Sequence, residues 1–360
     1  MSFSFNFDVH SVTPNRGGNS DGHELQHVKE ERVGKHMVDN TKPAASIKEA
    51  KEHHPVSDPQ YVLHDVSETV TIGSLPPLHF LNEAVFEKTA SEKDDVEKIL
   101  SCTAEQSSDL ISGVYEGGLK VWECTYDLLE LIEKDSKSFG EKRVLDLGCG
   151  AGLLGILALK TGAKHVHFQD YNSTVIEHLT LPNVILNCLD DGNGEDAKDR
   201  EDNGKLLREY SCENEVNEKQ EDQDWCPPSK KTAMDPTQQP SLARCRFFSG
   251  DWTTFLALLL KEDPPPIYDI ILTSETIYNT AYYPTLHETL HSLLAPDGLI
   301  YLATKSHYFG VGGGLHLFEK FVAQRDVFSL EHVWDLDEGL QRHIVVLRFK
   351  TATLESKDSD

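Results

Sequence analysis

The sequence predicts an α/β fold, namely a doubly wound, mostly parallel sheet with helices on both faces. From residue 143 onward, short apolar runs of strand length alternate with segments of helical periodicity. The first run, RVLDL at 143–147, ends in glycines, as expected for a buried strand that enters a tight turn. Two apolar runs near the C-terminus suit a closing antiparallel pair. Repeated β-α units of this kind imply helices on both sides of the sheet.

The predicted elements follow one another in chain order. The strands are short runs rich in aliphatic and aromatic residues, expected at 143–147, 165–169, 244–248, 268–273, 298–304, 327–333 and 343–349, which gives a seven-stranded sheet. The helices are expected between them at 153–160, 173–186, 251–261, 284–294 and 314–324. Pro284 stands in the first turn of its helix, where its missing N–H costs least. Ligands of such sheets bind outside the carboxyl ends of the strands.

The charge is concentrated in segments of weak periodicity. The chain of 360 residues has a formal net charge of −26, and residues 1–106 and 190–243 each contribute −8. These compositions predict a mostly disordered acidic and polar extension at 1–106 and a disordered acidic insert at 190–243. The insert then interrupts one folded domain at 107–350, and a polar tail follows at 351–360.

One detail of the extension allows an alternative. Three phenylalanines alternate with polar residues in FSFNF at residues 3–7. This pattern also fits a short strand that docks on the domain, and the two interpretations are both kept.

Composition also excludes several classes of protein. A chain this acidic is a poor binder of phosphate backbones, so no direct nucleic-acid binding is expected. No apolar run of about 18 residues predicts a membrane span, and no basic N-terminal region precedes an apolar stretch. The seven cysteines lack CxxC spacing, which indicates a reducing compartment without disulfides or a zinc site. We assign no metal ligands and expect a monomer.

The strongest motif is VLDLGCGAG at residues 144–152, where a strand turns into a helix. Its glycines permit a tight turn and a close approach of a ligand to the backbone. The next strand ends in Asp170, about 20 residues later, where a carboxylate can accept both hydroxyls of an adenosine ribose. A dinucleotide-binding fold and a purely structural turn are the alternatives.

This motif resembles that of class I, seven-β-strand S-adenosylmethionine-dependent methyltransferases, whose Rossmann-like fold the chain is then expected to share. Further segments resemble the protein-histidine N-methyltransferase family, namely SGVYEGGLKVWECTYDLL (112–129), HFQDYN (167–172), FFSGDW (247–252), LTSETIYN (272–279) and KSHYFGVGGG (305–314). The resemblance implies S-adenosyl-L-methionine as cofactor and methylation of a histidine side-chain nitrogen in a protein. It also implies a large-subunit ribosomal protein as substrate. The cysteines and the lack of an export signal indicate the cytosol as location, and the resemblance adds the nucleus, including the nucleolus.

The resemblance places residues 121–125 over the methionine part of the cofactor. These are Val121, Trp122, Glu123, Cys124 and Thr125, at the start of an amphipathic helix. The carboxylate of Glu123 suits the ammonium group of the cofactor. A helix that caps the sheet, with Trp122 in the core, is the alternative.

The glycine turn and the end of the second predicted strand are expected to hold the nucleoside. Gly148 lets the backbone approach the cofactor, and Asp146 lies just below it, within reach of the amino-acid end. Asp170 is expected to bind the ribose, with Gln169 and Tyr171 lining the adenosine pocket.

The third and fourth predicted strands contribute the remaining binding residues. Gly250, Asp251 and Trp252 occupy the position that meets the adenine in this fold, although Asp251 also suits a helix N-cap. Ser274 is expected to contact the cofactor.

Residues after the fourth and fifth predicted strands are expected to face the substrate. Glu275 and Tyr278, in an acid-x-x-Tyr arrangement, are the predicted catalytic residues, and a strand-end turn with a packed Tyr278 is the alternative. His307 and Tyr308 are candidates for the wall of the substrate channel.

The expected reaction is an in-line displacement, in which the protein mainly positions the nucleophile. A neutral imidazole attacks without prior loss of a proton. Glu275, assisted by Tyr278, is expected to select the tautomer and to stabilise the cationic product. The alternatives are a protein-lysine methyltransferase and a noncatalytic scaffold that binds ribosomal partners. The imidazole nitrogen that is methylated stays open.

Overall fold

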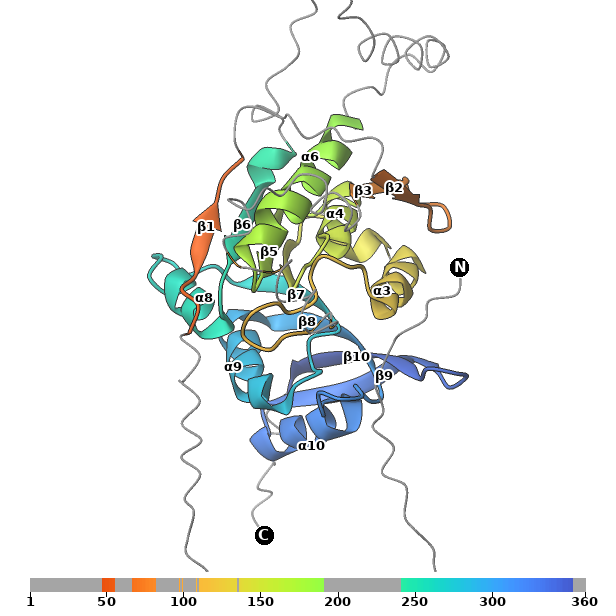
Figure 1. Ribbon diagram of the computed structural model, residues 1–360, viewed down its shortest axis with the longest axis vertical. Coiled ribbons are helices and arrows are strands. Elements are labelled where there is room, and N and C mark those ends of the chain that lie inside the picture. Colours follow the sequence, from red (N-terminus) through yellow and green to blue (C-terminus); the bar gives the residue numbers. More distant parts are fainter. Residues whose placement is uncertain are drawn as a thin grey trace, which may run out of the picture. The chain divides into compact units, whose positions relative to one another are not determined.

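The computed structural model describes residues 47–55, 67–81, 97, 99, 108, 110–134, 136–190 and 241–351. All of them belong to one compact unit, Ala45–Asp360. The strands of its main sheet are β1 (Lys51–His53), β4 (Arg143–Leu147), β5 (His165–Asp170), β6 (Cys245–Ser249), β7 (Tyr268–Ser274), β8 (Leu294–Lys305), β9 (Phe328–Leu336) and β10 (Arg342–Phe349). Their order among the described residues is β1-β6-β5-β4-β7-β8-β10-β9 (Figure 1).

Five neighbouring strands of this sheet, from β6 to β8, are parallel, and the strands at both ends are antiparallel to their neighbours. The order of the strands reverses at β4, because the chain proceeds from β4 to β5 and β6 and then returns to β7 on the other side of β4. The sheet is therefore doubly wound, as predicted, and a ligand site is expected where β4 and β7 end.

Helices cover both faces of the sheet. They are α3 (Glu123–Lys134), α4 (Leu153–Lys160), α5 (Ser173–Val175), α6 (Leu181–Asp190), α8 (Trp252–Leu259), α9 (Tyr283–Leu293) and α10 (Leu315–Arg325). The first four pack into one hydrophobic cluster and the last three into another, and Figure 1 shows the two groups on opposite sides of the strands. Adjacent residues of β4 enter different clusters, Val144 the first and Leu145 the second. Burial on both faces explains why the central parallel strands β4 and β7 contain adjacent apolar residues.

The predicted strands and helices are present with shifts of a few residues at their ends. The helix predicted at 173–186 is composite, because a π-helical segment at Ile176–Thr180 joins α5 to α6 and the helix continues to Asp190. The seven predicted strands are joined by an eighth, β1, which lies at the edge of the sheet.

Within residues 1–106, which are predicted to be mostly disordered, two parts form strands. β1 pairs with the edge strand β6, and Glu52 binds Arg246 through two bonds of 2.7 and 2.9 Å. The strands β2 (Ser67–Val70) and β3 (Leu78–Leu81) form a separate antiparallel pair. β3 is held on α6 because the amides of Leu81 and His79 donate to Asn183 and Asn187. Such short strands are stabilised by partners distant in sequence, which local composition does not reveal.

Other sequence predictions fall on residues outside the described ranges. They concern the FSFNF segment at 3–7, nearly all of the insert (191–240) and the end of the tail (352–360). Among the described residues, no helix is both long enough and apolar enough to cross a membrane.

Candidate active site

A cavity of about 270 Å³ lies where β4, β5, β6 and β7 end. Its wall consists of the loop before α3, the glycine turn after β4 and the residues that follow β5, β6, β7 and β8. This is the position at which a doubly wound sheet binds its ligands.

The glycine turn exposes its backbone to the cavity. Gly148 and Gly150 have φ angles of 70° and 50°, which suit glycine. A Cβ on Gly148 would lie 2.6 Å from the Thr276 methyl carbon, and one on Gly150 would lie 3.1 Å from the Gly118 carbonyl oxygen. The turn therefore requires glycine both for its conformation and for its close contacts with neighbouring segments.

Asp146 does not line the cavity, contrary to the expectation that it reaches the amino-acid end of a ligand. Its side chain is buried beneath the turn, where Oδ2 accepts a hydrogen bond of 2.9 Å from the amide of Gly155 in the first turn of α4. Burial raises the pKa of this carboxyl to about 8. Asp146 therefore supports the helix that begins at the turn.

Asp170 ends β5 and lines the cavity. Its Oδ2 accepts from the amide of Gly150 at 3.0 Å and its Oδ1 from the amide of Asn172 at 3.1 Å. These bonds fix the carboxylate between the glycine turn and the start of α5. Burial raises its pKa to about 6, although both amides favour the ionised form. A buried carboxylate held in this way is suited to accept hydrogen bonds from a diol.

Gln169 positions the neighbouring loop from behind the wall. Its Nε2 donates to the carbonyl oxygens of Asp170 and Gly250, each at 2.9 Å, and its Oε1 accepts from the indole N–H of Trp252 at 2.9 Å. The amide is fully buried, so water cannot replace these three hydrogen bonds, and the side chain ties β5 to the turn after β6.

Asp251 and Trp252 follow this turn and line the cavity. The Oδ1 of Asp251 accepts from the amide of Thr253 at 2.8 Å, so Asp251 is the N-cap of α8. Its second oxygen leaves acceptor capacity for a ligand, and the two roles are compatible.

On another part of the wall, a carboxylate lies among aromatic side chains. Glu116 accepts hydrogen bonds from the hydroxyls of Tyr278 and Tyr282, the latter at 3.0 Å, and from the amide of Gly113 at 2.7 Å. Trp252 contacts Tyr282 edge to face, with ring centroids 6.4 Å apart. Burial raises the pKa of Tyr278 well above its ordinary value and that of Tyr282 to about 12. Both hydroxyls therefore stay protonated and donate to Glu116.

Comparison with known proteins identifies the family. A family model described as a methyltransferase domain matches residues 123–342. The histidine protein methyltransferase 1 homolog of Bos taurus is 46% identical over 311 residues, which cover 85% of this chain and 74% of that protein. The chain belongs to the histidine protein methyltransferase 1 family. The member from Schizosaccharomyces pombe is 32% identical over 266 residues, or 71% of this chain and 70% of that protein.

Solved structures are more distant. A TehB-like SAM-dependent methyltransferase from Corynebacterium glutamicum aligns over 63% of this chain and 97% of its own, with 15% identity and a TM-score of 0.34. At that TM-score the likeness adds nothing to the assignment.

In this member of the histidine protein methyltransferase 1 family, most of the predicted site residues meet at one cavity. Those that line it are Val121, Trp122, Thr125, Gly148, Asp170, Tyr171, Gly250, Asp251, Trp252, Ser274, Glu275, Tyr278 and, from the channel prediction, Tyr308. Thr125 on α3 donates to the hydroxyl of Ser274 at the end of β7, at 3.1 Å. This bond closes the wall between the two elements.

Besides Asp146, four predicted residues do not line the cavity, namely Glu123, Cys124, Gln169 and His307. Glu123 instead forms an ion pair of 2.9 Å with Lys305, and Cys124 is fully buried in the core. Cys124 packs into the core because it lies on the apolar face of α3.

Glu275 lines the cavity, but its carboxylate also has partners within the protein. Its Oε1 lies 3.3 Å from Lys305 Nζ and 3.4 Å from the amide of Cys124 at the start of α3. The residue adopts a left-handed backbone conformation, with a φ of 59°, which costs free energy in a residue other than glycine. The buried Lys305 thus pairs with two carboxylates, those of the partly exposed Glu123 and the buried Glu275.

Sequence reasoning missed Glu116, Tyr282 and Lys305. Glu116 stands in the YEGG segment at 115–118, directly before two glycines. An acid at such a turn could have indicated a residue of the site. Lys305 is the last residue of β8, where strand ends of this sheet gather.

Proposed function

We propose that this methyltransferase transfers a methyl group from S-adenosylmethionine to a side-chain nitrogen of a histidine in a protein. The observation that supports it most strongly is that one cavity joins Asp170 with the cluster of Glu116, Tyr278 and Tyr282. Asp170 suits a ribose, and the cluster suits a planar, hydrogen-bonding ring that becomes positively charged. The names of the relatives from cattle and fission yeast agree with this proposal.

The donor set of the cavity fits S-adenosylmethionine. When bound, this cofactor supplies a methyl group activated on a sulfonium. Asp170 would accept from the ribose hydroxyls and Asp251 from the adenine amine, while Trp122 and Thr125 would contact the methionine part. Gly148 and Gly150 leave the backbone of the turn without side chains, so a ligand can approach it closely.

Glu116 is our candidate for the group that orients the substrate. Among the described residues, the amide of Gly113 and the hydroxyls of Tyr278 and Tyr282 donate to its carboxylate. One of roughly four acceptor sites remains for an imidazole N–H. An acceptor there holds one ring nitrogen protonated, so that the other presents its lone pair, and it stabilises the positive charge that forms. The surrounding aromatic faces favour a cation as well.

Glu275, the carboxylate favoured by the sequence, remains a second candidate. Its contacts with Lys305 and Cys124 suit a supporting role at the base of the cavity better than free access to a substrate ring. Replacing each acid separately distinguishes the two candidates, as set out in the Discussion.

We propose a large-subunit ribosomal protein as the substrate, and the cytosol and nucleus as the place of reaction. The basis is the resemblance of five sequence segments to protein-histidine methyltransferases. A substrate rich in Lys and Arg also agrees with the net charge of −26 of the chain.

Labelled methyl transfer followed by hydrolysis tests the proposal. The full chain is incubated with ribosomal proteins and methyl-labelled S-adenosylmethionine, and the hydrolysed products are separated. We expect the label in methylhistidine. Label in methyl-lysine would show a lysine methyltransferase, and the absence of cofactor binding by calorimetry would leave only a noncatalytic scaffold.

A further inference from the structure

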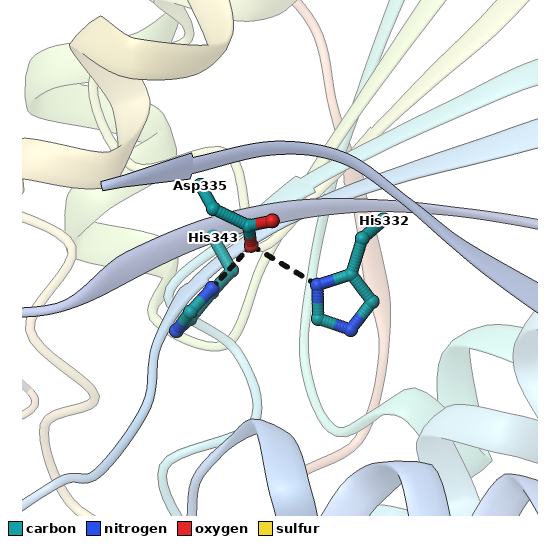
Figure 2. Close-up of side chains that lie close together, drawn as sticks. All are labelled: His332, Asp335 and His343. Atoms are coloured by element: carbon teal, nitrogen blue, oxygen red, sulfur yellow. Dashed lines mark hydrogen bonds and ion pairs between the residues drawn. The ribbon is translucent and has the colours of Figure 1, made fainter. Parts of the chain in front are cut away.

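Three potential metal ligands converge on the hairpin of β9 and β10, away from the cavity. They are His332 and Asp335 from β9 and His343 from β10, and Figure 2 shows their side chains directed toward one another. One ligand atom from each lies within 4.8 Å of the others. Their side chains are 39%, 42% and 13% exposed, so solvent reaches the cluster from one side.

A β-bulge brings the two residues of β9 to the same face. Asp335 is paired with His343 and His332 with Val345, so three steps along β9 correspond to two along β10. In a regular strand, residues three apart point to opposite faces. The extra residue in β9 redirects His332 toward Asp335. The backbone of β9 therefore places His332 and Asp335 on one face, and their proximity does not depend on side-chain rotamers alone.

The hydrogen bonds of His332 leave its second nitrogen facing an acceptor. Nε2 lies 2.7 Å from Glu319 Oε1, and because a carboxylate only accepts, Nε2 carries a hydrogen. Nδ1 lies 3.0 Å from Asp335 Oδ1, a second carboxylate oxygen. This contact requires a positive species between the two atoms, which is either a second proton on the ring or a metal ion.

His343 meets the same oxygen. Its Nδ1 lies 2.5 Å from Asp335 Oδ1, and its Nε2 lies 2.6 Å from the hydroxyl of Ser306. One carboxylate oxygen thus faces two ring nitrogens, while Glu319 and Ser306 hold the outer nitrogen of each ring. Outer-shell partners of this kind orient the histidine ligands of metal sites.

We propose that this cluster binds a divalent transition-metal ion, with Zn²⁺ as the best match. The ligands are Nδ1 of His332, Nδ1 of His343 and a carboxylate oxygen of Asp335, and water completes four-coordination. Two imidazoles and one carboxylate are typical of Zn²⁺, whereas Ca²⁺ and Mg²⁺ prefer oxygen ligands. Bonds of about 2.0–2.2 Å place neighbouring ligand atoms roughly 3.3 Å apart. Relative to the present separations of 3.0 and 2.5 Å from Asp335 Oδ1, this requires the exposed hairpin to open by about 0.3 Å at His332 and about 0.8 Å at His343.

From its position, the bound ion would stabilise the side of the active site that lies next to the end of β8 and the start of β10. Ser306, which holds His343, follows Lys305, and Lys305 pairs with Glu275 at the cavity. Arg342, which precedes His343, binds Asp127 on α3 at 2.6 Å. A metal that joins β9 to β10 would therefore stabilise the segments from which both ion pairs extend.

Metal titration of variants tests the proposal. The full chain and its His332→Ala and Asp335→Asn variants are dialysed against a chelator and titrated with Zn²⁺ and with Co²⁺. The control is His165→Ala, since His165 is an exposed histidine at the start of β5, which β4, β7 and β8 separate from β10 in the sheet. The 17 histidines and seven cysteines of the chain can add background binding, so equivalents are compared between variants.

We expect the unaltered chain and the His165→Ala control to bind one tight equivalent of Zn²⁺ more than the two cluster variants. Zn²⁺ should raise their melting temperature and leave that of the cluster variants unchanged. The corresponding Co²⁺ complex should show visible bands of four-coordination without the intense near-ultraviolet absorption of thiolate ligands.

Equal zinc stoichiometry and equal affinity in all four proteins would overturn the proposal. The cluster would then be a protonated histidine between two carboxylates. If a cluster variant fails to fold, the Co²⁺ spectrum of the unaltered chain decides alone. Thiolate absorption, or no tight equivalent at all, would contradict the ligand set. Methyl transfer is not the readout, so failure here is distinct from failure of the proposed activity.

Discussion

At the scale of single residues, Asp170 has the most direct connection to ligand binding. It is buried, it lines the cavity, and its two oxygens accept from backbone amides on either side. Asp170→Asn keeps the size of the side chain and removes its charge. We expect S-adenosylmethionine to bind on the order of 10²-fold more weakly, because charged hydrogen bonds to the ribose are lost. Calorimetry measures the affinity, and circular dichroism verifies the fold. Near-normal affinity would refute the ribose role.

The raised pKa of Asp170 predicts a pH dependence of binding. The ribose hydroxyls would donate to the ionised carboxylate, so binding lowers a pKa that burial has raised to about 6. Protons then compete with the cofactor, and affinity should be constant above this pH and fall as the pH decreases through it. Titrations in buffers of different ionisation enthalpy measure the released proton. Asp170→Asn should remove this dependence, and its persistence in that variant would assign the titration to another group.

The two candidate carboxylates predict different defects. Glu116→Gln keeps the size of the side chain and an acceptor for one of the two tyrosine hydroxyls, but removes the charge that stabilises a cationic imidazole. We expect kcat to fall on the order of 10²-fold, with little change in cofactor affinity. Glu275→Gln leaves buried Lys305 with one carboxylate fewer, so its main effect should be a lower melting temperature. Steady-state kinetics and thermal melts of both variants test this. The reverse pattern would return the catalytic role to Glu275.

The predicted site residues that line the cavity share a simple relation to the fold. Gly148, Asp170, Asp251 and Ser274 each follow or end an apolar strand, and the ends of parallel strands meet at one edge of a sheet. Glu116 lies in a loop before the first central strand, and periodicity does not define the path of that loop. Its contact with Tyr278 crosses 162 positions of sequence, and only the folded chain reveals it.

At the scale of elements, the central strands and the helices were predictable because each has its own hydrophobic pattern. β1 has none, since it is a polar strand of three residues. Its stability comes from the hydrogen bonds offered by β6 and from the ion pair of Glu52 with Arg246. The bulge in β9 was not predicted either, because the sequence of a strand does not determine which of its residues pair with those of the neighbouring strand.

Docking of residues 48–50 beside β6 explains the glycine at position 250. Gly250 has a φ of 121°, and a Cβ there would lie 2.6 Å from the Ala50 Cα. Gly250→Ala should therefore displace the segment that leads into β1 and destabilise the fold on the order of 2 kcal/mol or more. Gly339→Ala is the matched control, because its φ of 68° is also positive but no atom lies within 4 Å of the added carbon. Denaturant unfolding compares them, and equal losses would mean that contact with residue 50 is unimportant.

At the scale of the whole molecule, the acidic charge is divided between the folded domain and its appendages. Residues 190–243 alone contribute −8. We expect that replacing the acids of 191–240 by their amides weakens capture of a basic protein at low salt, because long-range attraction is lost. Cofactor affinity should not change. Substrate KM measured over a range of ionic strength tests this, and an unchanged salt dependence would limit the insert to a passive role.

The pairing of β1 with β6 also has a consequence for synthesis on the ribosome. The hydrogen bond between His53 and Ser249 joins residues 196 positions apart. Because translation proceeds from the N-terminus, Lys51–His53 has left the ribosome long before β6 is made. The strand that covers this edge is thus available as soon as β6 joins the sheet. Nascent chains on one messenger RNA lie side by side, and an open strand edge invites pairing between them. The order of β1 and β6 along the chain shortens the time during which that edge is exposed.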